Sequence, residues 1–366
     1  MKRRASITGW GKCVPPVKLT NADLEQLVDT TDEWVLARTG ISERGISHVE
    51  VTDLAEVAAH RALAAAGLDP TDIDLLVFAT TTPEITCPSN ACYLQERIGA
   101  VNAAAFDLNA ACSGWVYGSA TVASMIEAGI ADRVLLIGAE KLHFVMDYFD
   151  RAQCILFGDG AGAAVYEPST DGDGIMAHDL GADGAAGGTM MIPTLGTRGE
   201  LQRQREPAVE RLHFEGQTVF KLAVRGMEGS VRRALDRAGL GLDDVGLVVP
   251  HQANLRIIDA VTRRLGLPPE KVMLNIATHG NSAAASIPMA LADALDEGRI
   301  EPGSILVQTA FGGGLTWGST VIRWGDRVDP LAKSDLELAP CEKTVFELLA
   351  ANRAFFAPIH RHQVEN

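Results

Sequence analysis

The chain has 366 residues, 47% of them hydrophobic and 22% charged, which is the composition of a soluble globular protein with room for about two domains. Its formal net charge of −15 argues against a nucleic-acid partner, and no apolar run reaches the roughly 18 residues that a membrane helix needs. Six cysteines without a CxxC pair, and a basic N-terminus without a signal-peptide core, indicate a reduced, cytoplasmic protein with no metal site.

The predicted elements follow one another in the same order in two parts of the chain. In the first part a helix ends at Ala66-Gly67-Leu68, and a short acidic loop leads to an apolar strand at 75–78. In the second part a helix ends at Ala238-Gly239-Leu240, and a similar loop leads to a strand at 247–250. This order predicts an internal duplication of a mixed α/β unit.

A second repeated pattern supports the duplication. Phe157-Gly158-Asp159-Gly160 precedes an apolar strand, and so does Phe311-Gly312-Gly313-Gly314. We therefore expect an N-terminal half, a glycine-rich excursion near the active-site mouth, a C-terminal half and an extension with one amphipathic helix at 342–356. Their bounds are 1–170, 171–214, 215–324 and 325–366.

Cys112 lies where a predicted strand at 103–108 turns into a predicted helix at 113–120. A thiol at the start of a helix faces unpaired N–H groups and the positive end of the helix dipole, which both favour the thiolate. Most cysteines are simply buried apolar residues, but this position makes Cys112 a candidate nucleophile for acyl transfer.

Two polar residues of the second half are candidates to act with this thiol. His251 follows the strand at 247–250, at the end of a sheet where α/β folds bind their ligands. Asn281 stands in a turn before a helix of small residues. If the halves are related by a pseudo-twofold axis, both can reach Cys112. Two N–H donors there would stabilise the enolate that forms when a malonyl thioester loses CO₂.

Six motifs occur together in the order typical of one enzyme family. The chain resembles β-ketoacyl-acyl-carrier-protein synthase III, the condensing enzyme that initiates bacterial fatty-acid synthesis, from residue 5 to about residue 324. The motifs are Thr30-Thr31-Asp32-Glu33-Trp34 with Arg38-Thr39-Gly40-Ile41, Ala111-Cys112-Ser113-Gly114, Phe157-Gly158-Asp159-Gly160-Ala161-Gly162, Val249-Pro250-His251-Gln252-Ala253-Asn254, Gly280-Asn281, and Phe311-Gly312-Gly313-Gly314-Leu315-Thr316-Trp317-Gly318.

The resemblance implies a thiolase-like α/β fold, in which two duplicated mixed-sheet halves form α-β-α-β-α layers. It implies a homodimer that condenses an acyl-CoA with malonyl-acyl-carrier protein, with coenzyme A thioesters as substrates and no permanently bound cofactor. It further implies that Cys112, His251 and Asn281 form the catalytic triad. The backbone N–H groups of Cys112 and Gly313 would form the oxyanion hole.

The same resemblance implies binding residues for both substrates. Trp34 and Arg151 would sandwich the adenine of coenzyme A, and Arg38 and Asn254 would bind elsewhere along that molecule. Two basic residues, Lys221 and Arg256, would receive the acidic carrier protein. From the residues alone, a core aromatic for Trp34 and solvated surface charges for Lys221 and Arg256 are the favoured interpretation.

The chain departs from the family at several positions. Cys87 stands where members primed by acetyl groups often have Phe, at a residue that reaches the acyl channel from the partner subunit. The smaller side chain predicts a deeper channel and a medium or longer acyl primer, unless neighbours such as Ile85 refill the space. Asn281-Ser282-Ala283 replaces the usual Asn-Thr-Ser. The extension and the enlarged region between the halves indicate a specialised branch.

Alternative functions remain open at the level of sequence. A related enzyme of secondary metabolism would condense two acyl or β-ketoacyl thioesters with the same triad. An ester- or amide-forming acyltransferase needs a base, and such relatives tend to have Asp where Asn281 stands. A thiolase proper needs a second cysteine near the C-terminal glycine motif, which Phe311-Gly312-Gly313-Gly314 lacks. The intact triad argues against a non-enzymatic scaffold.

Overall fold

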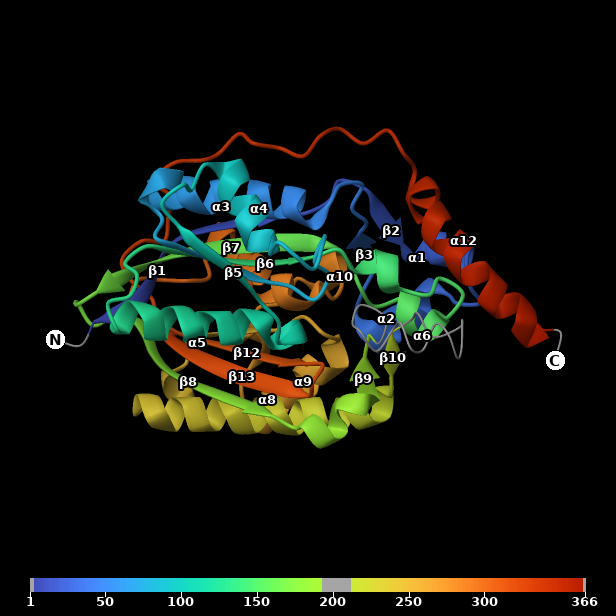
Figure 1. Cartoon of the computed structure of the whole chain (residues 1–366). Coiled ribbons are helices and arrows are strands. Elements are labelled where there is room, and N and C mark those ends of the chain that lie inside the picture. Colours follow the sequence, from blue (N-terminus) through green and yellow to red (C-terminus); the bar gives the residue numbers. More distant parts are fainter. Residues whose placement is uncertain (1–2, 193–211, 365–366) are drawn as a thin grey trace.

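The computed structural model describes residues 3–192 and 212–364, which form two mixed β-sheets between layers of helices (Figure 1). The first sheet has the order β1-β7-β6-β4-β5 and the second the order β11-β12-β13-β8. The strands of the first sheet are β1 (Arg4–Cys13), β4 (Leu75–Ala79), β5 (Ala104–Leu108), β6 (Val134–Glu140) and β7 (Gly160–Ser169). Those of the second are β8 (Gly174–Ala182), β11 (Leu247–Pro250), β12 (Ile305–Gly312) and β13 (Thr316–Arg323).

Helices cover both outer faces and fill the space between the sheets, which confirms the predicted five-layer fold (Figure 1). The outer layer on the first sheet consists of α3 (Val51–Ala66) and α4 (Asn90–Ile98). The outer layer on the second consists of α8 (Gly216–Ala238) and α9 (Leu255–Leu265). The central layer is α5 (Gly114–Glu127) and α11 (Ser286–Asp296), whose apolar side chains share one core with both sheets.

Shorter elements complete the described ranges. They are the strand pairs β2 (Lys18–Thr20) with β3 (Glu43–Gly45) and β9 (Met190–Met191) with β10 (His213–Phe214), and the helices α1 (Asn21–Glu25), α2 (Asp32–Thr39), α6 (Arg151–Cys154), α10 (Ile276–His279) and α12 (Val345–Val364).

The two sheets pair their strands in the same way. β4 and β6 are parallel, and β6, β7 and β1 follow as antiparallel neighbours. In the second sheet β11 and β12 are parallel, and β12, β13 and β8 follow as antiparallel neighbours. The first sheet continues beyond β4 with the parallel strand β5, whereas the second continues beyond β11 only with a single bridge between Val248 and Val272.

Local sequence signals explain where the corresponding helices end. Gly67 after α3 and Gly239 after α8 both adopt the left-handed conformation, with φ of 70°. A residue without Cβ adopts this conformation at little cost, so glycine ends a helix there and turns the chain toward the next strand.

Two predicted segments differ from the observed elements. The range 171–214 was expected as an excursion outside both halves, but residues 174–182 of it form β8 in the second sheet. β8 begins at Gly174, and its residues 175–180, Ile-Met-Ala-His-Asp-Leu, show no alternation of apolar and polar side chains, so no periodic pattern marks the strand. The amphipathic helix expected at 342–356 is α12, which begins at Val345 and extends to Val364. Residues 193–211 of the excursion lie outside the described residues.

Further observations restrict the chemistry of the chain. All six cysteines are free thiols. Within residues 3–192 and 212–364, no group of three or more His, Cys, Asp or Glu side chains is placed to hold a metal ion. None of the helices in these ranges has the length and apolar character needed to cross a membrane.

Candidate active site

Cys112 occupies a strained turn between β5 and α5. Asn109 accepts the N–H of Ala111 through its side-chain oxygen at 3.1 Å, and Ala111 has a positive φ of 49°. Residues 111–113 then form one 3-10 turn that continues directly into α5. Positive φ is unfavourable for alanine, and such strain is typical of functional sites. The turn places Cys112 among the first N–H groups of the helix.

The glycine motif at the end of β12 packs directly on this turn. A Cβ atom on Gly312 would lie 2.7 Å from the backbone nitrogen of Cys112 and 2.9 Å from that of Ser113. The next residue, Gly313, lines the same cavity as Cys112. The two proposed oxyanion donors, the N–H groups of Cys112 and Gly313, thus belong to segments in close backbone contact. Their function as an oxyanion hole stays a prediction.

His251 follows β11 and is buried, with 1% of its surface exposed. Its Nδ1 lies 2.6 Å from the Ser286 hydroxyl at the start of α11. Burial lowers the pKa of His251 to about 3, so the imidazole is neutral in the neutral pH range. A neutral imidazole carries one N–H, and the Ser286 contact decides which nitrogen holds it.

Asn281 lies at the start of a turn like that of Cys112. Its side-chain oxygen accepts the N–H of Ala283 at 2.9 Å, and Ala283 has a positive φ of 44°. Among residues 3–192 and 212–364, the side-chain nitrogen of Asn281 makes one hydrogen bond, a long one of 3.5 Å to the carbonyl oxygen of Ala253. Its N–H donors are therefore available to a substrate.

One cavity brings the three residues of the predicted triad together. Cys112, His251 and Asn281 all line a cavity of about 680 Å³. A second cavity, of about 440 Å³, also contacts Cys112. We call these the outer and the inner cavity. Because Cys112, Phe157 and Met190 line both, the thiol lies at their junction.

The inner cavity has a mostly apolar wall, and the sequence analysis identified few of its residues. It is lined by side chains of Leu142, Met146, Phe157, Met190, Met191, Ile192 and Leu212, together with Thr81, Asn109, Ala111, Cys112, Gly187, Ala283, Gly313 and Gly314. Such a lining suits a straight hydrocarbon chain attached to the Cys112 sulfur. No motif marks these residues, because their common feature is only where the fold places them.

The protonation state of Cys112 differs from the sequence-based expectation. The start of a helix was expected to favour the thiolate. In the structure, burial raises the pKa of the Cys112 thiol to about 12, and the carboxylate of Glu140 raises it further. Desolvation therefore outweighs the helix dipole, and the thiol is the resting form of the free protein.

Glu140, whose carboxylate raises the pKa of Cys112, has a shifted pKa itself. It ends β6, is fully buried, and accepts hydrogen bonds from the hydroxyl groups of Thr80, Thr81 and Thr82 and from the N–H of Thr81. Burial raises the pKa of its carboxyl group to about 7, although these hydrogen bonds act in the opposite direction. Thr81 also lines the inner cavity, so this network supports the wall beside Cys112.

Three of the four predicted coenzyme A residues line the outer cavity, and the fourth, Arg151, contacts one of them. Trp34, Arg38 and Asn254 line it, and the side-chain amide of Asn254 donates to the carbonyl oxygen of Arg38 at 3.0 Å. The guanidinium carbons of Arg38 and Arg151 lie 4.0 and 4.8 Å from the centre of the Trp34 ring. Arg151 stacks directly on Trp34, so the predicted sandwich requires Arg151 to move away from the indole ring.

The two predicted carrier-protein residues, Lys221 and Arg256, are exposed and also line the outer cavity. Lys221 comes from α8 and Arg256 from α9, so two helices supply positive charge at the same opening. Cys87 is exposed and does not line the inner cavity of its own chain.

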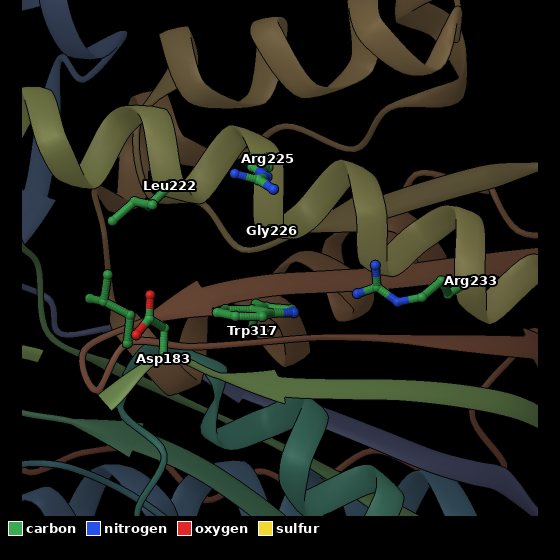
Figure 2. A pocket seen from close by; sticks show the side chains of 7 residues that line it. Asp183, Leu222, Arg225, Gly226, Arg233 and Trp317 are labelled. Atoms are coloured by element: carbon green, nitrogen blue, oxygen red, sulfur yellow. The ribbon is translucent and has the colours of Figure 1, made fainter. Parts of the chain in front are cut away.

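A third cavity, of about 350 Å³, lies between α8 and β13 (Figure 2). The indole ring of Trp317 lies along its floor, below α8 (Figure 2). It contains none of the predicted site residues. Its lining consists of Asp183, Leu222, Arg225, Gly226, Arg233, Leu315 and Trp317.

Ser286 is a residue of the site that the sequence analysis missed. It lies five residues after Asn281 and contacts His251, and its hydroxyl also lies 2.8 Å from the carbonyl oxygen of Ala283. The small-residue helix start was noted in the sequence, but only the packing of α11 beside β11 brings its first residue to the imidazole.

Comparison with known proteins agrees with the geometry. The family model for 3-oxoacyl-(acyl-carrier-protein) synthase III matches residues 106–184, and the model of the C-terminal part of that family matches residues 235–324. A β-ketoacyl-(acyl-carrier-protein) synthase III of Desulfitobacterium hafniense is 48% identical over 88% of this chain and 98% of its own length.

Two further relatives give the same result. A β-ketoacyl-(acyl-carrier-protein) synthase III 2 of Vibrio cholerae is 43% identical over 94% of this chain and 95% of its own. The crystal structure of 3-oxoacyl-(acyl-carrier-protein) synthase III from Aquifex aeolicus superposes with a TM-score of 0.82 at 43% identity. It covers 87% of this chain and all of that one.

Proposed function

The chain belongs to the β-ketoacyl-acyl-carrier-protein synthase III family of acyl-transferring condensing enzymes, and we propose that it joins an acyl-CoA primer to malonyl-acyl-carrier protein through a thioester on Cys112. The observation that carries the proposal is the single cavity lined by Cys112 from one half and by His251 and Asn281 from the other. The reaction belongs to fatty-acid biosynthesis in the cytoplasm.

The first step transfers the acyl group to Cys112. The sulfur attacks the thioester carbonyl carbon of acyl-CoA, the bond from that carbon to the CoA sulfur breaks, and the thiol proton passes to the departing CoA sulfur. The negative oxygen of the intermediate accepts hydrogen bonds from the N–H groups of Cys112 and Gly313. Because the thiol is protonated at rest, its proton must be removed in the course of this step.

The second step forms the carbon–carbon bond. Asn281 and His251 donate hydrogen bonds to the thioester carbonyl of the malonyl group, which stabilises the enolate as the bond to CO₂ breaks. The enolate carbon attacks the acyl group on Cys112, and the sulfur leaves and regains a proton from solvent. For His251 to donate from Nε2, the Ser286 hydroxyl must turn its one proton toward Nδ1, 2.6 Å away, instead of donating it to the carbonyl oxygen of Ala283 at 2.8 Å.

We propose a medium or longer straight acyl primer. The inner cavity of about 440 Å³ is larger than an acetyl group requires, and apolar side chains form most of its wall. The assembly we propose is a homodimer, in which Cys87 of the second copy closes the inner cavity. The exposure of Cys87, and the position of β5 as an edge strand of the first sheet, support this arrangement.

An ester- or amide-forming acyltransferase is not favoured. That reaction needs a base to take the proton of an alcohol or amine. His251 has a pKa lowered to about 3, and the amide of Asn281 accepts no proton in this range. A condensing enzyme of secondary metabolism uses the same triad, and it would prefer a second acyl or β-ketoacyl thioester to malonyl-carrier protein.

The two steps can be separated by mutation. We expect His251→Ala and Asn281→Ala each to leave acylation of Cys112 by acyl-CoA within a few-fold of the parent. Each should slow decarboxylation of malonyl-carrier protein by about 10²- to 10³-fold, the effect of removing one preorganised donor. Mass spectrometry of the intact protein measures acylation, and release of labelled CO₂ measures decarboxylation. Parental decarboxylation rates in both variants would contradict the assigned roles.

A further inference from the structure

The C-terminal extension lies outside the part of the chain that the family model matches, which ends at residue 324. Its first part runs along α3 as a strap (Figure 1). The N–H groups of Leu331 and Ala332 donate to the carbonyl oxygens of Ala65 and Ala64, both at 3.1 Å. The strap leads to α12, which contacts the 3-10 turn at 142–145 and lies at the end of the molecule away from the N-terminus (Figure 1).

α12 binds a segment with little regular structure of its own, residues 142–150, which follows β6. A 3-10 turn covers only 142–145, and its closing hydrogen bond, from the N–H of Met146 to the carbonyl oxygen of His143, is long at 3.4 Å. The side-chain amide of Asn352 lies 3.0, 3.0 and 2.9 Å from the carbonyl oxygens of His143, Phe144 and Met146. The two N–H groups of the Asn352 amide are shared among these three carbonyl groups, so one side chain ties α12 to the backbone of the segment.

A second set of contacts fixes the end of the same segment. The buried carboxylate of Asp147 accepts the N–H of Phe149 at 3.0 Å and lies 2.7 Å from Nε2 of His360. The imidazole of His360 stacks on the ring of Phe149, with 5.0 Å between ring centres. The guanidinium carbon of Arg353 lies 5.0 Å from the centre of that ring. Side chains from two turns of α12 therefore contact this segment.

The segment that α12 fixes is also one wall of the inner cavity. Leu142 and Met146 line this cavity together with Cys112. The backbone groups that Asn352 binds are those of Met146 itself and of the residue after Leu142. Val345 and Leu349 of α12 belong to the same buried apolar cluster as Leu142 and Met146. The apolar face of α12 is thus continuous with the cavity wall.

We propose that α12 is a clasp that fixes the 142–150 wall, and that Asn352 and His360 are positioning residues for the selection of acyl-chain length. Neither side chain touches the acyl group. The hydrogen bonds of Asn352 and His360 hold the backbone on both sides of Met146. Without these bonds the wall can move, and the cavity then accommodates acyl chains that do not fit the intact cavity. The proposal rests on the proposed function, since it assigns the inner cavity to the acyl chain.

The test compares acyl-chain profiles. The parent and Asn352→Ala are assayed with acetyl-CoA, octanoyl-CoA and dodecanoyl-CoA by mass spectrometry of acylated Cys112 and by kcat/KM with malonyl-carrier protein. We expect the ratio between the best and the worst primer to fall by about 2- to 30-fold in the variant, the usual size of such indirect coupling. Malonyl decarboxylation, which depends on the outer cavity, stays at the parental rate. Phe355→Ala, an exposed position on the same helix, is the matched control and keeps the parental profile.

Asn352 is buried, so a second position keeps the test decisive if Asn352→Ala does not fold. His360→Ala removes the contact to Asp147 and shifts the profile in the same direction, and His360→Gln, which retains an N–H donor, restores it. A parental profile in folded variants, or equal slowing with every primer, overturns the clasp and leaves the proposed function intact. Absence of an acyl adduct on Cys112 in the parent, with every primer, overturns the proposed function instead.

Discussion

The turn that carries Cys112 and the turn that carries Asn281 have the same backbone and different chemistry. In both, an Asn side chain accepts the N–H of the second residue after it, Ala111 or Ala283, and that alanine has a positive φ of 49° or 44°. In both, a 3-10 turn then continues into a central helix, α5 or α11. Counting from the two asparagines, the position of Cys112 in the first turn is that of Ala284 in the second.

The difference shows how a repeated backbone can be used twice at one site. The first turn supplies the thiol. The second supplies the amide of Asn281, and its helix begins with Ser286, which contacts His251. The residue corresponding to Ser286 in the first turn is Gly114, which offers no hydroxyl group. Cys112 and Asn281 both line the outer cavity, and in the proposed mechanism the nucleophile and the donors come from different halves.

The two turns also contact the opposite sheets through glycines. The nitrogen of Cys112 packs on Gly312 in β12, and the carbonyl oxygen of Ala284 packs on Gly138 in β6, at 2.7 and 2.4 Å from where a Cβ atom would stand. Each half thus holds the active turn of the other at backbone distance, so the geometry of the site depends on both sheets at once.

The largest expected effect comes from exchanging the side chains between the turns. Cys112→Ala should abolish the acyl adduct and lower condensation by at least about 10³-fold, because the nucleophile is lost. Adding Ala284→Cys should not restore the adduct, since residue 284 is fully buried and lines neither cavity. Mass spectrometry after incubation with acyl-CoA measures this. An adduct on residue 284 would show that the backbone alone defines the nucleophile position.

A smaller effect is expected from filling the space under the second turn. Gly138→Ala places a methyl group against the carbonyl oxygen of Ala284 and should lower the free energy of unfolding by about 3 kcal/mol. Gly246→Ala is a matched control, because its Cβ atom would lie in ordinary contact at 3.5 Å from the carbonyl oxygen of Ile305. Urea denaturation compares the two. Equal losses in both variants would mean that the contact between the halves is not tight at Gly138.

The smallest effect concerns the pH dependence of stability. Burial lowers the pKa of His251 to about 3 from 6.5 and raises that of Glu140 to about 7 from 4.5. As the pH falls below 6.5, the unfolded chain protonates His251 and the folded chain does not, so His251 removes roughly 1.4 kcal/mol of stability per pH unit. Between about pH 7 and 4.5 the folded chain holds a proton on Glu140 that the unfolded chain has released, which adds stability at the same rate as the pH falls.

Because the two contributions nearly cancel in the parent, single variants separate them. Relative to the parent, His251→Asn should gain about 2 kcal/mol between pH 6.5 and 5, and Glu140→Gln should lose about as much. Urea midpoints at several pH values measure both changes. Stability curves that stay parallel to that of the parent would show that these groups titrate as in the unfolded chain.

The features that the sequence predicted are those marked by local patterns of a few neighbouring residues. Gly67 and Gly239 mark helix ends, the apolar runs before Cys112 and His251 mark strands, and both residues lie at the corners that these patterns indicate. The three residues of the proposed triad could be chosen because each belongs to a short motif with a recognisable neighbourhood, and the structure places all three around one cavity. Three features could not be predicted from local patterns: β8, the extent of α12, and the contact of Ser286 with His251. Each depends on a partner segment far away in the chain.

By itself, the sequence determined the α/β fold, the family and the three residues that meet at one cavity. Tertiary structure alone decided that Cys112 rests as a thiol, because its pKa depends on desolvation by residues from many segments and on the carboxylate of Glu140. It also decided that Arg151 stacks on Trp34 and that α12 binds the cavity wall. The burial of a side chain and its long-range contacts depend on residues from many distant segments of the chain. A local sequence pattern therefore does not predict them.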